Sequence, residues 1–524
     1  MSLEREKKYL LLAVLLAFAF SLLRFSTIPV GTFFDDAHYL ILAEGLIEGS
    51  GYRLINFPSM PTEQAFPPGW PLLLAPFAGL FPGNLMVPKL LALFFSIGSI
   101  PLADLLFRDR LAHLERLLFL LMVALNPLFI GAAGTAMSEP AFLFFSLLTL
   151  VLLDRFLSAR ESNESTHWNV VRMAAVVLLC AGFSMVVRTT GITLVMAIVP
   201  FLVPKRRWRQ MTFLSLAGAV IGGILLFLLS RGVVDFSLFS PQYSEHVQYL
   251  SGELGSYLRF WDFLPWFDWP AIGNVLVPIF DLNLSFVPFF DLFKSIAPIV
   301  IILLVLSGFA LSLSPVSKIR PTEIYFLLFL ALFYLWTAYI DEVQQRQLIP
   351  VIPFFTFYLI KILFWGGERL AQAKWQKAAF GVPLFFCSVI ILLLVGRNVQ
   401  AWLNPVKDTV LNYEVGGTWL QENTEADVVY AVNYPHPSYL YSRRLTEYLP
   451  VGLGPLEFEE YVVERNISYL LIQPDFDDWD TGQLEVRPEV ARDLVPYLET
   501  NPERYRLVFK DEANRVTIFE VVGQ

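Results

Sequence analysis

The sequence predicts an α-helical polytopic membrane protein with a small α/β domain at its C-terminal end. Hydrophobic residues make up 56% of the 524 residues and charged residues only 16%, whereas soluble domains carry roughly 25% charged residues. Apolar stretches that are long enough to cross a bilayer recur along the first ~400 residues. Beyond them the composition becomes that of a soluble domain, with short strand patterns between polar turns.

The charges between the apolar stretches predict how the chain crosses the membrane, because basic residues concentrate on the cytoplasmic side. We expect about 11 transmembrane helices in the plasma (inner) membrane, with the N-terminus cytoplasmic and the C-terminal domain extracytoplasmic. The run from 173 to 204 is too long for one span and is interrupted at Arg188, so we expect a hairpin with Arg188 at its outer tip. The expected spans lie at about 9–28, 84–106, 117–133, 139–157, two within 173–204, 211–230, 295–313, 323–340, 348–365 and 379–396.

This topology divides the chain into two domains. We expect residues 1–400 to form a transmembrane catalytic domain with large outer loops at 29–83 and 231–292, and residues 401–524 to form the soluble domain. Within the soluble domain we expect strands at about 427–432, 469–472 and 516–521 and helices at about 415–422, 458–464 and 488–499.

Several function classes are disfavoured by what the sequence lacks. The two cysteines, Cys180 and Cys387, lie in apolar runs and are too few for a disulfide framework or a thiolate metal site. Basic clusters are short and sit at helix ends, so we expect no nucleic-acid partner. The glycine loops of nucleotide-binding proteins, the G-x-S-x-G motif and the H-E-x-x-H motif do not occur.

The most informative stretch is the start of the first outer loop. Asp35 and Asp36 follow the first apolar helix closely, and His38 and Tyr39 come directly after them. Paired carboxylates at a membrane surface, covered by aromatic residues, suggest a site that handles an amphipathic substrate. We therefore take Asp35 and Asp36 as the catalytic candidates.

Other ionisable residues fall on the same, outer side of the expected topology. Ionisable residues at membrane depth are costly and tend to be functional or paired. Cations beside acids suggest a pocket that binds a phosphate and holds a base, since arginine is a natural partner of phosphate oxygens. The candidates are Arg346, Arg188 and Lys89 for phosphate and His38, Tyr39, Glu63 and Glu139 for substrate, with Asp341 and Glu342 nearby in the sequence.

Each candidate also has a structural interpretation. One of the two aspartates could cap a juxtamembrane helix at about 37–49, and Glu139 could cap the helix that begins at Pro140. Arg188, Arg346 and Lys89 could be interfacial side chains that reach toward water. His38 and the two aspartates could hold a divalent cation, but they lack clear ligand spacing. The sequence therefore assigns no metal ligand and no definite cofactor. The other histidines, His113, His167, His246 and His436, are scattered and are expected to have no catalytic role.

Taken in order, these motifs resemble those of the GT-C glycosyltransferases, and more closely the branch of protein O-mannosyltransferases and lipid A aminoarabinose transferases. The motifs that carry the resemblance are Asp35-Asp36-Ala-His-Tyr, Pro67-Pro-Gly-Trp-Pro, Ser138-Glu-Pro140, Arg188-Thr-Thr-Gly191 and Arg346-Gln-Leu-Ile-Pro350-Val-Ile-Pro353.

The resemblance implies a GT-C fold over most of residues 1–400 and transfer of a sugar from a polyprenyl-phosphate donor, with inversion at the anomeric carbon. It implies an acceptor hydroxyl on a glycan, lipid or protein at the outer face. By position Asp35 matches the family's proposed base, Asp36 the second acid of its pair, and Arg346 and Arg188 its two arginines. The Lys-Pro-Pro motif of the aminoarabinose enzymes is here Phe66-Pro67-Pro68, which argues against that sugar. The sugar-binding repeats of eukaryotic protein mannosyltransferases are also missing.

A transporter or flippase for a lipid-linked or amphipathic solute is the alternative. It predicts broken helices and polar residues near the midplane of the membrane. The expected topology instead places the polar groups at one interface, which favours the enzyme.

Overall fold

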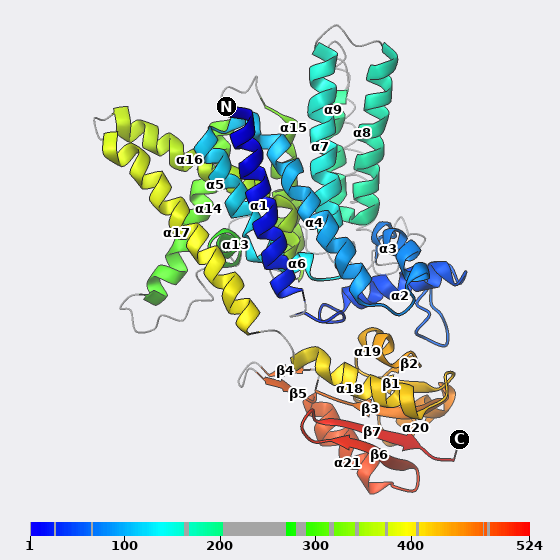
Figure 1. Ribbon diagram of the computed structural model, residues 1–524. Coiled ribbons are helices and arrows are strands. Elements are labelled where there is room, and N and C mark those ends of the chain that lie inside the picture. Colours follow the sequence, from blue (N-terminus) through cyan, green and yellow to red (C-terminus); the bar gives the residue numbers. More distant parts are fainter. Residues whose placement is uncertain are drawn as a thin grey trace, which may run out of the picture.

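The computed structural model describes residues 2–25, 28–63, 66–161, 167–202, 269–278, 290–313, 319–340, 345–372, 376–404, 408–474, 476–478 and 483–523. The predicted span at 211–230, most of the predicted second outer loop, and Asp341 and Glu342 lie outside these residues. Within the described residues a bundle of long helices stands on a smaller C-terminal domain, and two short helices lie between them (Figure 1).

Most helices of the bundle coincide with the predicted spans to within about seven residues at each end. They are α1 (Ser2–Arg24), α4 (Met86–Phe107), α5 (His113–Ala124), α6 (Pro127–Ala133), α7 (Glu139–Glu161), α8 (His167–Val187), α9 (Ile192–Leu202), α14 (Phe290–Ser312), α15 (Pro321–Ile340), α16 (Ile352–Gln372) and α17 (Gln376–Leu403). Among the described residues, four helical stretches are long and apolar enough to cross a membrane, or five if the bent pair α5 and α6 is one span. The chain is therefore a multi-pass membrane protein, and the full number of spans remains a prediction.

Two breaks in the helices have local causes. The span expected at 117–133 is split between α5 and α6, which are bent by 51°. Asn126 caps α6 by accepting hydrogen bonds from the backbone N–H groups of Leu128 and Phe129, and Pro127 cannot donate to the preceding turn. The second break falls at Arg188, between α8 and α9, where the sequence predicted it.

Three short helices occur where the sequence predicted loops or left the structure open. In the first outer loop, α2 (Asp35–Ile47) and α3 (Gly69–Leu80) lie across the lower end of the bundle in Figure 1. Helix α13 (Trp269–Leu276) falls within the predicted second outer loop. The start of α3 packs against the end of α8 so closely that a Cβ at Gly69 would lie 2.6 Å from the backbone of Val186.

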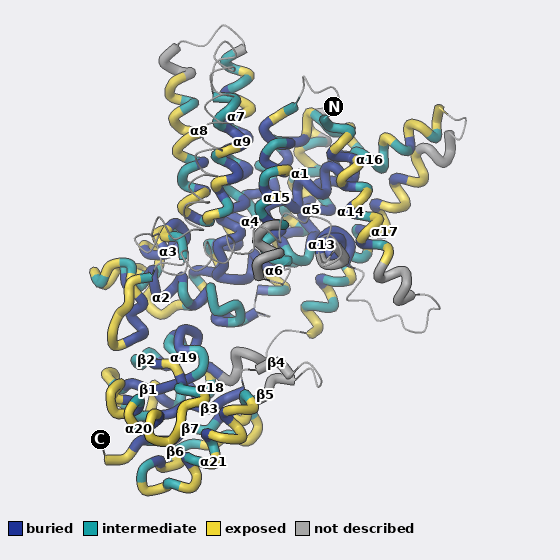
Figure 2. The backbone as a smooth tube through the Cα atoms, turned by 180° about the vertical axis from the view of Figure 1, so that it is seen from behind, coloured by how far each residue is buried: buried dark blue, intermediate teal, exposed yellow. Residues whose placement is uncertain are grey.

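The exposed residues of the bundle are largely apolar. Figure 2 shows exposed segments along α8, along α17 and in the C-terminal half of α16. Large hydrophobic side chains such as Leu179 and Phe385 are exposed on α8 and α17. In water such a surface would be unfavourable, whereas in lipid it is expected.

The C-terminal domain is built on a five-stranded sheet with the strand order β2-β1-β3-β7-β6. Strand β1 pairs with β2 and β3 in parallel, whereas β7 pairs with β3 and β6 in antiparallel orientation. Helices cover the sheet, and α19 and β2 face α2 (Figure 1). The elements are α18 (Asp408–Asn423), β1 (Val429–Val432), α19 (Pro435–Ser442), β2 (Leu445–Tyr448), α20 (Pro455–Glu464), β3 (Ile467–Ile472), β4 (Phe476–Asp478), β5 (Gln483–Glu485), a π-helix (Val490–Leu494), α21 (Val495–Thr500), β6 (Tyr505–Asp511) and β7 (Val516–Val521).

The predicted α/β class is confirmed, and β1, β3 and β7 match the three predicted strands. Strands β2 and β6 were missed. They are less buried than β1 or β3 and carry more polar residues, so they lack the apolar pattern that sequence analysis relies on.

Candidate active site

Asp35 and Arg346 meet at the lower end of the bundle. Asp35 is the first residue of α2, and Arg346 belongs to a 3₁₀ helix (Gln345–Val351) that leads into α16. The Arg346 Nη2 atom donates to Asp35 Oδ2 at 2.6 Å, although the residues are 311 positions apart. Both side chains are partly exposed, at 24% and 30%. The guanidinium also lies over the Phe33 ring, 5.6 Å from its centre. A cation and a carboxylate are thus held together where substrate can reach both.

A second ion pair lies beside the first. Arg188 Nη1 is 2.9 Å from Glu139 Oε1, and it also donates to the Ser138 hydroxyl at 2.9 Å. That hydroxyl is 3.2 Å from the Tyr39 hydroxyl of α2. Burial raises the pKa of Tyr39 to about 12, so its phenol stays protonated at neutral pH. One hydrogen-bonded chain therefore joins α2, the start of α7 and the end of α8.

Asp36 has a different environment from its neighbour. Its side chain is 0% exposed and accepts a hydrogen bond from the Gly31 N–H at 2.8 Å. Burial raises the pKa of Asp36 to about 6, against the opposing effect of the Gly31 N–H. The residue at the N-cap of α2 is Phe34, so the interpretation of one aspartate as the cap residue is wrong. Asp36 instead ties the preceding loop to the helix.

Two predicted site residues lie at the margins of this cluster. Lys89 is buried at the start of α4 and donates to the carbonyl groups of Phe25 and Ile28, the latter at 2.9 Å. These hydrogen bonds fix the segment that connects α1 to α2 against the start of α4. Glu63 accepts a hydrogen bond from the Phe66 N–H at 3.3 Å. Neither contact reaches the Asp35–Arg346 pair.

The backbone just before Asp35 is strained. Phe34 has a φ of 56°, a region that costs a non-glycine residue roughly 1–3 kcal/mol. Its ring stacks on Tyr434 of the C-terminal domain, with 4.3 Å between ring centres. This interdomain contact helps to hold Phe34 in its conformation and with it the position of Asp35.

A pair of stacked histidines also joins α2 to the C-terminal domain. The rings of His38 and His436 are 3.5 Å apart between centres. Burial lowers the pKa of both, that of His436 to about 2 with a further contribution from His38. Two neutral rings can stack at this distance, whereas two charged rings would repel. The sequence placed His436 among the scattered histidines and missed this contact, because His38 and His436 lie in different domains.

Hydrogen bonds fix the C-terminal domain against the first outer loop. Thr446 of β2 donates its N–H to Asn56 O at 2.7 Å and its hydroxyl to the same oxygen at 3.1 Å. The Asn56 side chain donates back to the Thr446 hydroxyl at 2.9 Å. Arg443 donates to both carboxylate oxygens of Glu44 at 2.9 and 2.8 Å. The backbone at Gly31, which has a φ of +102°, lies very close to the C-terminal domain. A Cβ at this position would lie 3.1 Å from Pro437.

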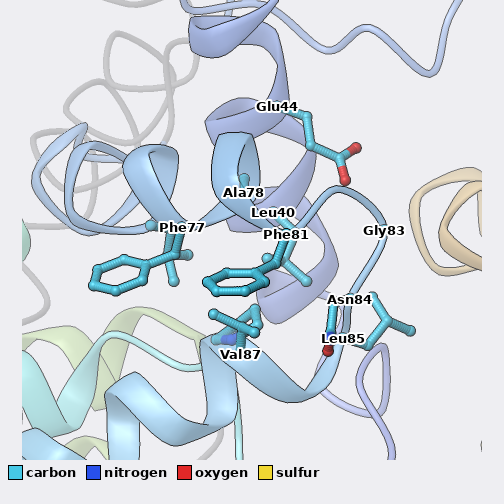
Figure 3. Close-up of a pocket in the computed structure, with 11 residues that line it drawn as sticks. Leu40, Glu44, Phe77, Ala78, Phe81, Gly83, Asn84, Leu85 and Val87 are labelled. Atoms are coloured by element: carbon cyan, nitrogen blue, oxygen red, sulfur yellow. The ribbon is translucent and has the colours of Figure 1, made fainter.

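A pocket between α2, α3 and α4 is too small for a substrate. Figure 3 shows Phe77 and Phe81 lying beside Val87, with Glu44 above them. Its volume of about 10 Å³ corresponds to roughly one water molecule.

The described residues contain no group of three or more His, Cys, Asp and Glu side chains arranged to hold a metal ion. His38 in particular turns toward His436 and the Phe34 carbonyl, with Nδ1 3.1 Å from that oxygen. The arrangement around Asp35 is thus one carboxylate with one guanidinium.

Comparisons with known proteins add information about the fold. No protein-family model matches the chain, and no curated protein matches its sequence. Among solved structures, it is similar to ArnT from Cupriavidus metallidurans bound to undecaprenyl phosphate, with a TM-score of 0.55 and 11% identity, covering 98% of this chain and 97% of that one. It is also similar to the oligosaccharyltransferase AglB from Archaeoglobus fulgidus, with a TM-score of 0.54 and 12% identity, covering 89% and 69%.

ArnT and AglB are both GT-C glycosyltransferases. The chain described here therefore has the GT-C fold, as the sequence motifs predicted.

Proposed function

We propose that this protein is an inverting glycosyltransferase that moves a sugar from a polyprenyl-phosphate donor to an acceptor hydroxyl at the outer face of the plasma membrane. The observation that carries the proposal is the 2.6 Å contact between Asp35 and Arg346. It brings the proposed base and the proposed phosphate-binding cation to one accessible place. The GT-C fold supports the same reaction class, and the ArnT structure contains a polyprenyl phosphate.

In the proposed reaction Asp35 is the general base. Its carboxylate takes the proton of the acceptor hydroxyl as the hydroxyl oxygen attacks the anomeric carbon. The bond between that carbon and the phosphate oxygen breaks on the opposite face, and the lipid phosphate leaves with the bonding electrons. The negative charge that develops on the phosphate is stabilised by Arg346.

The pairing of Asp35 with Arg346 suggests how the base becomes active. A donor phosphate that binds the Arg346 guanidinium competes with the Asp35 carboxylate for it. Once the guanidinium turns to the phosphate, the carboxylate is released to accept a proton. Arg188 is held by Glu139 and Ser138, so we assign it to positioning Tyr39 and α7 beside the donor. Asp36 and Lys89 hold the loop that carries Asp35.

The positions of the other buried ion pairs favour an enzyme over a transporter. In the described residues Arg116 pairs with Asp104 and Arg110 pairs with Glu323, at 2.6 and 2.5 Å. Both pairs lie at the far ends of their helices from Asp35. The ion pairs thus gather at the two ends of the bundle, whereas a transporter is expected to bind its substrate near the midplane.

The test uses purified protein and radiolabelled polyprenyl-phosphate mannose, glucose or arabinose. Asp35→Asn should abolish transfer while the protein still inserts and unfolds at the wild-type temperature. Full activity of that variant would reject Asp35 as the base.

A further inference from the structure

An open cleft of about 570 Å³ separates the start of α2 from the C-terminal domain. This size falls within the roughly 300–1,000 Å³ of ligand-binding pockets. Phe34 and His38 line one side, and Tyr434, His436, Tyr448 and Arg487 line the other. Because residues from two domains form it, the cleft exists only when the C-terminal domain is docked.

The cleft adjoins the proposed base. Phe34 directly precedes Asp35, and His38 follows it by three residues on the same side of α2. Asp35 does not itself line the cleft, but its carboxylate is close enough to the His38 ring to interact with it electrostatically. The cleft consequently suits the acceptor, whose hydroxyl must reach that carboxylate.

The lining combines aromatic faces with polar groups. Tyr448 is 51% exposed at the rim, and Arg487 donates to the Tyr434 hydroxyl at 3.0 Å. Asn433 adds an amide that can both donate and accept hydrogen bonds. A sugar ring has an apolar C–H face and an edge of hydroxyl groups, so it matches a surface of this kind. A lipid chain would instead need a continuous apolar groove.

An extended peptide is disfavoured as the acceptor, because the nearest sheet edge is already partly occupied. Strand β2 is at the edge of the five-stranded sheet, where a peptide could add a further strand. The Thr446 N–H at this edge already donates to Asn56 O at 2.7 Å. The first outer loop thus occupies part of the edge that a peptide would use.

The interdomain contacts join the two sides of the cleft in the absence of substrate. The hydrogen bonds of Thr446 with Asn56 and of Arg443 with Glu44 hold its two sides. Because a preformed site loses less conformational entropy on binding, it favours recognition of one acceptor class.

We infer that this cleft is an acceptor site for a carbohydrate chain, and that Tyr434 and Tyr448 of the C-terminal domain determine acceptor specificity. The inference rests on the proposed function, since it names the acceptor of that reaction. The glycosyl group moves to a hydroxyl of the bound carbohydrate, whose proton goes to Asp35, and the lipid phosphate is the leaving group.

The test supplies purified full-length protein with the radiolabelled donor and three acceptor pools from the cell envelope. The pools are protease-treated polysaccharide, an organic-solvent lipid extract, and delipidated protein. Release of labelled sugar into water is measured in parallel, because it reports donor use without any acceptor. Label should enter the polysaccharide pool.

Variants then connect the transfer to the cleft. Tyr448→Ala should raise the KM for the polysaccharide by about tenfold, as expected for the loss of one stacking ring, and leave release of sugar into water unchanged. Leu456→Ala, at an 82% exposed position of α20 outside the cleft, is the matched control and should behave as wild type. Thermal unfolding of both variants shows whether the domain stays folded.

The possible failures are distinct. Label in the lipid or protein pool, or a wild-type acceptor KM for both Tyr448→Ala and Tyr434→Ala, would overturn the carbohydrate site and leave the glycosyltransferase standing. Release of sugar into water without transfer to the polysaccharide would also overturn it. If the protein neither transfers nor releases sugar from any of the donors, the proposed function itself is rejected, and the acceptor site with it.

Discussion

Replacing Arg188 by glutamine should destabilise the protein by stranding a buried carboxylate. Glu139 is 1% exposed and pairs with Arg188, which is 19% exposed, at 2.9 Å. Removing one partner of a buried ion pair costs about 3–5 kcal/mol, because the remaining charge stays desolvated. We expect a loss of about 3 kcal/mol in the free energy of unfolding, at the lower end of this range. The site of Arg188 retains some contact with solvent, and Arg346 also interacts electrostatically with Glu139.

The assay is thermal unfolding of the purified protein in one detergent, with two comparison variants. The double variant Arg188→Gln/Glu139→Gln should recover most of the loss, because neither charge then remains. Arg108→Gln removes a pair with Asp109 whose side chains are 45% and 82% exposed, so it should change stability by less than about 1 kcal/mol.

Two results would refute this reasoning. Wild-type unfolding of Arg188→Gln would show that Glu139 does not depend on the pair. A double variant no more stable than Arg188→Gln would show that the loss has another origin. Donor kinetics of the double variant separate stability from substrate binding. A raised donor KM in a protein of restored stability would show that Arg188 also contacts the phosphate.

Three further outcomes are expected. Arg346→Ala should raise the donor KM by about 10–100-fold, because a charge-assisted hydrogen bond contributes about 1.5–3 kcal/mol, and unchanged donor kinetics would count against a phosphate role. The pKa of Asp36 rises from 3.8 to about 6 on folding, so the contribution of Asp36 to stability should fall as the pH rises from about 4 to 6. In Asp36→Asn, measured by unfolding across this range, stability should rise more steeply with pH than in the wild type, because the falling contribution of Asp36 is removed. The pKa of His436 falls from 6.5 to about 2 on folding. The unfolded chain then binds the extra proton, and the contribution of His436 to stability should fall as the pH drops below about 6.5. His436→Phe should weaken that fall, and an unaltered profile would contradict burial of a neutral imidazole.

Local features of the sequence were enough to predict the class of fold. A span needs about 20 apolar residues, and this requirement is visible in any window of the chain. The interruption at Arg188 was predicted for the same reason, since its run was too long for one crossing. The split at Asn126 was missed because the apolar pattern continues through it, although Asn-Pro is a recognisable helix start.

Counting crossings also predicted which polar residues could share one side of the membrane. It grouped Asp35, Arg188 and Arg346 correctly at one end of the bundle, because each follows or precedes a span on that side. The number of membrane crossings does not determine which side chains are in contact. Asp35 pairs with Arg346, and Arg188 pairs with Glu139, only because the 3₁₀ helix Gln345–Val351, α7 and α8 pack together in a particular way.

The sequence by itself thus determined a helical membrane protein, its α/β appendage and the set of candidate site residues, since these depend on composition and short-range pattern. Only the tertiary structure decided how the appendage meets the site. The contacts of Tyr434 with Phe34 and of His436 with His38 join residues about 400 positions apart. They depend on shape complementarity between two folded surfaces, which leaves no periodic signal in either segment.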